Sequence, residues 1–166
     1  MTVRTANLLG LLACAGLLAY AYYAQFVMHL EPCPLCIFQR LGVLAIALVF
    51  AIAAAHDPAG WPRRVYAALL GLAALATIGV AARQLYIQSL PPGSVPACGA
   101  SLDFMLKVFP LTDVLVKVLT GSGECAKVDW RFLGLAMPAW VLIAGLGLGA
   151  WGLWANLRHR PPVLRF

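Results

Sequence analysis

The stretch EPCPLCIFQR, residues 31–40, determines the fold and the chemistry expected of this chain. It contains two cysteines, Cys33 and Cys36, separated by two residues, and a long apolar run lies on each side of it. Such flanking runs make the stretch a tight turn at one edge of a membrane. Two sulfurs this close in sequence can form and break a disulfide with little backbone movement. The pair therefore predicts a redox centre, with a metal site and a static staple as alternatives.

The composition is that of a membrane protein. Of the 166 residues, 63% are hydrophobic and 11% are charged, whereas soluble domains are about 45–50% apolar and about 25% charged. The net charge of +6 does not indicate a nucleic-acid partner, because the basic residues flank the apolar runs instead of forming one polar face. The chain has no glycine-rich phosphate loop and no clear internal repeat, so we predict a single membrane domain over residues 1–166.

The apolar runs predict an all-α membrane protein, a bundle of four transmembrane helices. Each run is long enough to cross a hydrocarbon core of about 30 Å at about 1.5 Å per residue. The spans cover about residues 8–30, 37–56, 65–87 and 132–157, and the loops on the cysteine side cover about residues 31–36 and 88–131. In the second loop, apolar residues recur at helical spacing on both sides of Pro110. This pattern predicts two short amphipathic helices in the membrane interface.

The distribution of basic residues predicts the orientation of the bundle. The termini side carries Asp57 as its acid and six arginines: Arg4, Arg63, Arg64, Arg158, Arg160 and Arg165. The opposite side carries five acids against three lysines, with Arg40, Arg83 and Arg131 near the ends of the spans. We therefore expect both termini in the cytoplasm and the cysteine loops in the other compartment.

The five cysteines divide into one mid-span residue and four on the opposite side from the termini. Cys14 is interpreted as a small buried hydrophobe. The apolar run continues past it, so the first run is a span and not a cleaved leader. The other four are expected to lie in an oxidising compartment and to form disulfides.

Four cysteines allow three disulfide connectivities. The simplest closes Cys33 on Cys36 and pairs Cys98 with Cys125. Structural zinc sites usually use two closely spaced pairs. Because Cys98 and Cys125 are far apart in sequence, no metal is predicted.

Local geometry favours exchange over a static staple. A Cys33–Cys36 disulfide closes too small a loop to constrain the unfolded chain much. With Pro34 as the first helical residue, Cys33 would cap the second span, where a helix N-terminus favours a thiolate. Arg40, four residues after Cys36, would favour a thiolate there and donate hydrogen bonds to a carbonyl arriving from the lipid. The alternative for Arg40 is a snorkelling interfacial arginine. The chain has no motif for a water-soluble cofactor, which favours a lipid-soluble electron acceptor.

Together these residues resemble the bacterial disulfide bond formation protein B (DsbB) family, which are inner-membrane thiol oxidases. The resemblance covers nearly the whole chain. It rests on the four spans, on PCPLC at residues 32–36 followed by Arg40, and on Cys98 and Cys125 in the second loop. It also rests on WRFLGLAMPAW, residues 130–140, at the start of the fourth span.

The resemblance implies a two-step relay in the bacterial inner membrane, with the cysteine loops in the periplasm. A reduced DsbA-like thioredoxin-fold oxidase would react with the Cys98–Cys125 disulfide, with Cys98 forming the mixed disulfide. Electrons would pass to Cys33–Cys36 and then to ubiquinone or menaquinone in the lipid. The family pattern places Cys36 against the quinone with Arg40 binding it, whereas helix capping favours Cys33 as the stabilised thiolate.

One departure from the family and two competing interpretations stay open. Some members carry a histidine at the outer end of the third span, where residues 83–88 here are RQLYIQ. A ring-nitrogen role is therefore absent, and Gln88 and Arg83 are the candidate substitutes. The first competing interpretation is a relative of the vitamin K epoxide reductases, in which the Cys-x-x-Cys normally falls late in the chain. The second is a non-catalytic membrane scaffold with structural disulfides.

Overall fold

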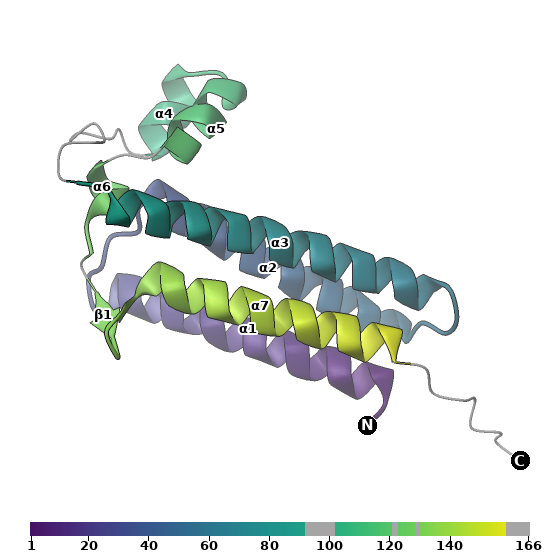
Figure 1. Ribbon diagram of the computed structural model, residues 1–166. Helices are drawn as coiled ribbons and strands as arrows, with labels where there is room; N and C mark the ends of the chain where they lie inside the picture. The colour runs from purple at the N-terminus through teal and green to yellow at the C-terminus, as the bar shows by residue number, and fades with distance from the viewer. Residues whose placement is uncertain (92–101, 121–122, 129, 159–166) are drawn as a thin grey trace, which may run out of the picture.

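The computed structural model describes residues 1–91, 102–120, 123–128 and 130–158 (Figure 1). Within these residues four helices are long and apolar enough to cross a membrane, with mean hydropathies between 1.4 and 2.3. They are α1 (Val3–Phe26), α2 (Pro34–His56), α3 (Pro62–Ser89) and α7 (Met137–Leu157). The predicted four-helix membrane bundle is confirmed, and the chain is a multi-pass membrane protein.

The shorter elements gather at the end of the bundle that holds Cys33 and Cys36, which we call the cysteine end (Figure 1). They are α4 (Leu102–Val108), α5 (Leu111–Thr120), α6 (Gly123–Ala126), β1 (Arg131–Phe132) and β2 (Leu135–Ala136). Two of them, α4 and α5, are the short helices expected in the second loop. At the opposite end, which we call the terminal end, α1 begins and α7 ends.

The fourth long helix begins later than residue 132, where the apolar run starts. Residues 131–136 form an antiparallel hairpin in which Arg131 pairs with Ala136. Its turn places Leu133 and Gly134 at φ of 51° and 81°, a left-handed conformation that a helix does not use. Pro138 then occupies the first turn of α7, where its missing N–H costs nothing.

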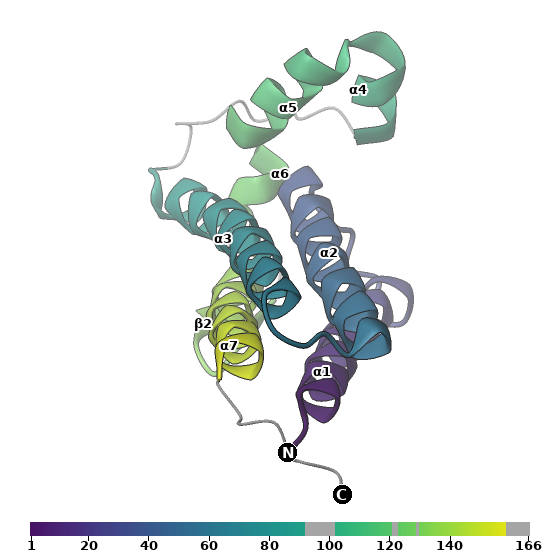
Figure 2. The ribbon, with the colours of Figure 1, turned by 90° about the vertical axis from the view of Figure 1, so that its right-hand side faces the viewer.

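Packing within the bundle is closest between α3 and α7, between α1 and α2, and between α2 and α3, as the view in Figure 2 shows. Glycines on α7 allow the first of these contacts. A Cβ on Gly149 would lie 2.9 Å from Ala74 Cβ, and one on Gly152 would lie 2.8 Å from the Leu70 side chain. Small residues at such interfaces let helix backbones approach each other in lipid.

Helices α1 and α7 are joined by polar contacts at the terminal end. Asn7 and Asn156 exchange amide hydrogen bonds of 3.3 and 3.0 Å, and both side chains are buried. Trp151 Nε1 donates to the Ala6 carbonyl at 2.9 Å. Each interhelical hydrogen bond in a membrane contributes about 0.6–2 kcal/mol. These bonds fix α1 against α7 at the terminal end, whereas a cavity separates the same two helices at the cysteine end.

The contact between α2 and α3 gives a prediction for stability. A Cβ on Gly42 would lie 2.3 Å from Thr77 Oγ1, and the buried Thr77 hydroxyl donates to the Ala73 carbonyl at 2.8 Å. We expect Gly42→Ala to destabilise the bundle by about 1–3 kcal/mol, the usual cost of overpacking. The measurement is the midpoint of thermal unfolding in detergent, followed by tryptophan fluorescence.

The matched control is Gly79→Ala on α3, where an added Cβ meets nothing within 4 Å. Because alanine favours a helix over glycine by about 1 kcal/mol, this variant should unfold at or above the wild-type temperature. A Gly42→Ala protein as stable as the Gly79→Ala protein would contradict the close packing of α2 on α3.

Candidate active site

The two cysteines of the Cys-x-x-Cys pair occupy the first turn of α2. Pro34 is the first helical residue, and Cys33 is the N-cap, with its Sγ accepting a hydrogen bond from the Cys36 N–H at 3.4 Å. This is the capping arrangement that the sequence predicts. The two Sγ atoms lie 2.8 Å apart. Since a disulfide is about 2.05 Å long, a small movement is enough to join or separate them.

A buried glutamine of α3, Gln84, contacts both sulfurs, and a buried glutamine of α2, Gln39, holds Gln84 in place. Gln84 Nε2 lies 3.4 Å from Cys33 Sγ and 3.4 Å from Cys36 Sγ. Gln39 Nε2, on α2, donates to Gln84 Oε1 at 2.7 Å. This bond orients the Gln84 amide so that its N–H donors point at the sulfurs. An N–H donor favours negative charge on sulfur, so Gln84 stabilises whichever sulfur is released as a thiolate.

The sequence analysis did not single out Gln39 or Gln84. Both residues are 3% exposed within spans that are otherwise largely apolar. A polar side chain inside a membrane span is costly and often functional, and this signal could have found them. The sequence analysis named Gln88 and Arg83 as substitutes for the family's histidine. In the structure, the α3 side chain that contacts the cysteines is the Gln84 amide.

Arg40 extends from α2 to α1. Its Nη1 donates to Gln25 Oε1, and its Nη2 donates to the Ala21 carbonyl at 3.1 Å. The guanidinium carbon lies 5.4 Å from the centre of the Tyr22 ring. A guanidinium has five N–H donors, so these two bonds leave others for a further acceptor. Arg40 also lines the cavity next to the cysteines.

The cavity lies among α1, α2, α3 and α7 at the cysteine end and has a volume of about 160 Å³. Both sulfur-bearing residues of α2 line it. The polar part of its wall includes Gln39, Arg40 and Gln84, and the apolar part includes Leu17, Val43 and Val141. Because an apolar cavity of about 150 Å³ binds benzene, this cavity accommodates a six-membered ring.

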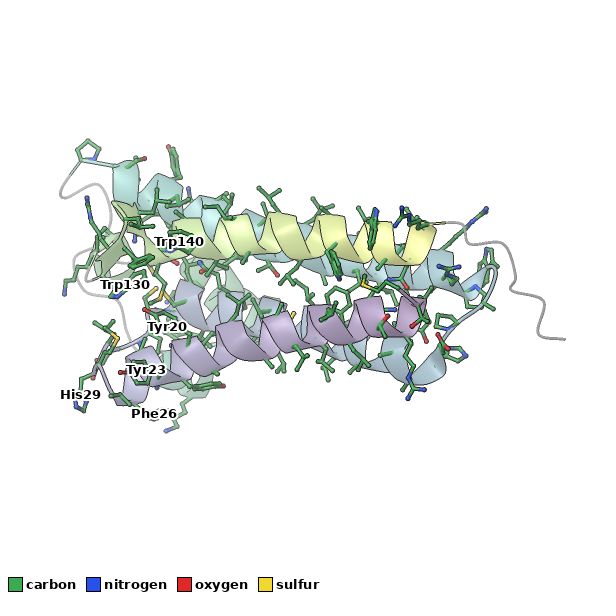
Figure 3. All side chains as sticks on the ribbon, turned by 90° about the horizontal axis from the view of Figure 1, so that it is seen from below. Tyr20, Tyr23, Phe26, His29, Trp130 and Trp140 are labelled. Atoms are coloured by element: carbon green, nitrogen blue, oxygen red, sulfur yellow. The ribbon has the colours of Figure 1, made fainter. Side chains whose placement is uncertain are left out.

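Aromatic side chains join α1 to the hairpin beside this cavity. Tyr20 meets Trp130 edge to face with ring centres 6.0 Å apart, and Trp130 stacks on Phe132 at 5.9 Å. Phe132 in turn contacts Trp140, whose Nε1 donates to the Phe132 carbonyl at 3.2 Å. Figure 3 shows Tyr20, Trp130 and Trp140 together at the cysteine end. All three line the cavity, so rings form the wall where α1 and α7 are apart.

A third cysteine, Cys125, lies next to Cys33. Cys125 on α6 is 1% exposed and belongs to an apolar cluster with Leu35, Ile87, Met105, Val114 and Val118. Hydrogen bonding between the Cys125 and Cys33 thiols raises the pKa of Cys33, and hydrogen bonding to Cys36 and burial raise this pKa further. Cys33, which precedes α2, therefore stays protonated when it is reduced. Cys98 lies outside the described residues.

The two candidate substitutes for the histidine have different surroundings. Gln88 lines the cavity and donates through Nε2 to the Lys127 carbonyl at 3.5 Å. Arg83 donates instead to the Leu119 and Thr120 carbonyls at the end of α5. The structure brings four of the predicted site residues together at the cysteine end: Cys33, Cys36, Cys125 and Arg40.

A family profile described as "Disulfide bond formation protein DsbB" matches residues 3–155 of the chain. The chain belongs to the DsbB family. The resemblance noted in the sequence is thereby confirmed. A disulfide-forming oxidoreductase needs cysteines that can exchange bonds, and the DsbB family assignment fits the three thiols that meet at the start of α2.

Curated relatives cover almost the same length. A protein from Methylococcus capsulatus is 55% identical over 157 residues, which are 93% of this chain and 96% of the relative. One from Nitrosococcus oceani is 53% identical over 154 residues, with coverages of 93% and 91%. One from Chromobacterium violaceum is 48% identical over 160 residues and covers 96% of each chain. All three are named "Disulfide bond formation protein B", so this DsbB-family chain acts in disulfide bond formation.

Proposed function

We propose that this chain is a quinone-dependent thiol oxidase that reoxidises a DsbA-like periplasmic dithiol oxidase. One observation carries the proposal: Cys33 hydrogen-bonds with Cys125, and both Cys33 and Cys36 line a ring-sized cavity. A cysteine pair that contacts both a third thiol and the cavity can pass electrons from a protein thiol to a molecule dissolved in the lipid.

The first exchange oxidises the partner. A thiolate of the reduced partner attacks Cys98 in the Cys98–Cys125 disulfide, forms a mixed disulfide with Cys98, and releases Cys125 as a thiolate. The partner's second thiolate then attacks the mixed disulfide and releases Cys98. The partner gains one disulfide, and Cys98 and Cys125 become a dithiol. The assignment of Cys98 to the mixed disulfide follows from the family resemblance.

The second exchange moves the electrons to α2. The Cys125 thiolate attacks Cys33 in the Cys33–Cys36 disulfide, and Cys36 leaves as a thiolate. Cys98 then attacks Cys125, which restores the Cys98–Cys125 disulfide and releases Cys33. Gln84 Nε2, within 3.4 Å of both sulfurs, donates to the departing sulfur throughout. The result is a reduced Cys33–Cys36 pair beside the cavity.

The residues around the cavity fit a quinone head group. The volume suits one ring, Arg40 has N–H donors left for a ring carbonyl, and much of the wall is apolar. Bound ubiquinone or menaquinone supplies a two-electron, two-proton acceptor, so that the Cys33–Cys36 dithiol returns to a disulfide. Arg40 binds and orients the quinone carbonyl. Cys36, four residues before Arg40 and on the same face of α2, is the sulfur that faces the quinone.

We propose the same location that the sequence predicts, the bacterial inner membrane with both termini in the cytoplasm. Support comes from four described arginines at the terminal end: Arg4, Arg63, Arg64 and Arg158. Arginines that directly flank the spans favour the cytoplasmic side of a membrane protein. The cysteine end then faces the periplasm, where a DsbA-like partner meets it.

The test is quinone reduction by the purified protein in detergent, followed by the loss of quinone absorbance. We expect turnover of a short-chain ubiquinone or menaquinone only when a reduced DsbA-like protein is also present, and none with the oxidised partner. If the protein is instead a scaffold, its disulfides will stay oxidised and no quinone will be consumed. That result would overturn the proposed function.

A further inference from the structure

Helix α3 presents two neighbouring faces at the cysteine end. Gln84 and Gln88 line the cavity on one face. On the next face, Ile87 belongs to the apolar cluster of Cys125, and Val80 packs against that cluster. Arg83 is four residues before Ile87 and so lies on this second face. It therefore belongs to the part of α3 that supports Cys125 and not to the cavity wall.

Arg83 holds the C-terminal end of α5. Its Nε donates to the Leu119 carbonyl at 2.9 Å, and its Nη2 donates to the Thr120 carbonyl at 3.3 Å. The guanidinium carbon also lies 5.3 Å from the centre of the Tyr86 ring on the same helix. The last four carbonyls of a helix have no partner inside it, and a cation there is favourable. Arg83 thus caps α5 from a neighbouring helix.

The end of α5 determines where Cys125 lies. Val114 and Val118, on the buried face of α5, pack in one cluster with Cys125 and with Leu35 of the Cys-x-x-Cys turn. Only two residues separate the end of α5 at Thr120 from the start of α6, which carries Cys125. The outer surface of α5 is exposed, with Leu111 at 65% and Val116 at 64%. Its apolar inner face and Arg83 therefore both attach it to the bundle.

We propose that Arg83 is a positioning residue that clamps the end of α5 to α3 and so holds Cys125 against Cys33. The apolar cluster can slide, because dispersion contacts have no fixed direction. The two charged hydrogen bonds to adjacent carbonyls fix both the distance and the orientation of α5. The consequence for turnover rests on the proposed function, whereas the consequence for the exposure of Cys125 does not.

The experiment is maleimide labelling of the reduced full-length protein in detergent, with each cysteine resolved by mass spectrometry of peptides. In Arg83→Met we expect labelling of Cys125 to be about tenfold faster, since losing a charge-assisted hydrogen bond shifts a local opening equilibrium by about that factor. Labelling of Cys14, in the other core cluster, should not change. Arg83→Lys, which keeps the charge and can donate to a carbonyl, should restore most of the protection.

The matched control is Arg64→Met, an exposed arginine at the other end of the same helix, which should label like wild type. Kinetics give a second readout. Arg83→Met should lower kcat/KM for the reduced partner by about tenfold, because Cys125 spends less time against Cys33. Its KM for quinone should stay at the wild-type value.

Unchanged labelling of Cys125 in Arg83→Met would overturn the proposal. So would a raised KM for quinone with unchanged labelling, which would assign Arg83 to the cavity. If Arg83→Met does not fold, Arg83→Gln, which retains an N–H donor, is scored by the same criteria. A wild-type protein that reduces no quinone would defeat the proposed function, but the labelling difference would still test the clamp.

Discussion

Quinone reduction by a Cys36→Ser variant is expected to fall to the uncatalysed rate, a loss on the order of 10⁴-fold or more, as when a nucleophile is removed. Cys36 is one half of the pair and lines the cavity. A serine oxygen cannot form the disulfide with Cys33, so the pair can no longer store two electrons. The measurement is the steady-state rate of quinone loss with excess reduced partner.

Cys33→Ser should be equally inactive, because Cys125 then has no sulfur to attack. The matched control is Cys14→Ala, which removes a thiol buried in the core cluster with Phe50 and Leu148. This variant should keep at least about half of the wild-type rate, since a small change of volume in the core affects stability more than chemistry. Full turnover by either serine variant would overturn the proposed role of the Cys33–Cys36 pair.

Much of the fold followed from local rules. The lengths of the apolar runs predicted four spans, and four helices of that kind are present. Pro34 at the first helical position and Cys33 as the cap were predicted from two adjacent residues, because helix starts depend on nearby side chains. The two short helices of the second loop followed from their own periodicity.

The parts that local rules missed depend on contacts between distant residues. Gln84 meets Cys36 across 48 positions of sequence, and Gln39 meets Gln84 across 45. Periodicity indicates which face of a helix is buried, but not which helix lies against it. The late start of α7 was missed for a different reason. Residues 132–136, FLGLA, are apolar, so most of the hairpin looks like a continuation of the span.

Contacts of the same long-range kind place the Arg40 side chain, but its role in binding quinone stays a prediction. The sequence allowed either a quinone ligand or a snorkelling arginine. In the structure the side chain contacts Gln25 and the Ala21 carbonyl on α1, and Arg40 lines the cavity. Bonds to α1 would also orient the remaining N–H donors towards a carbonyl in the cavity.

We expect Arg40→Met to raise the KM for quinone by about 10–100-fold, the value of one hydrogen bond to a charged donor. The trapped redox states of the cysteines after reaction with the partner should match wild type, because Arg40 acts after the thiol exchanges. Arg40→Lys should recover little. A lysine ammonium cannot reproduce the planar fork that serves Gln25, Ala21 and a ring carbonyl together. The measurement is the dependence of rate on quinone concentration at saturating reduced partner.

A Gln25→Leu variant separates binding of quinone from attachment of α2 to α1. It removes one of the two bonds that orient Arg40 but leaves the guanidinium charge, so its KM for quinone should rise less than that of Arg40→Met. If Arg40 only ties the two helices together, both variants will unfold at a lower temperature and neither will change the KM for quinone. The positive charge beside the cavity would then have no role in binding, and the quinone site would depend on its shape and its apolar walls.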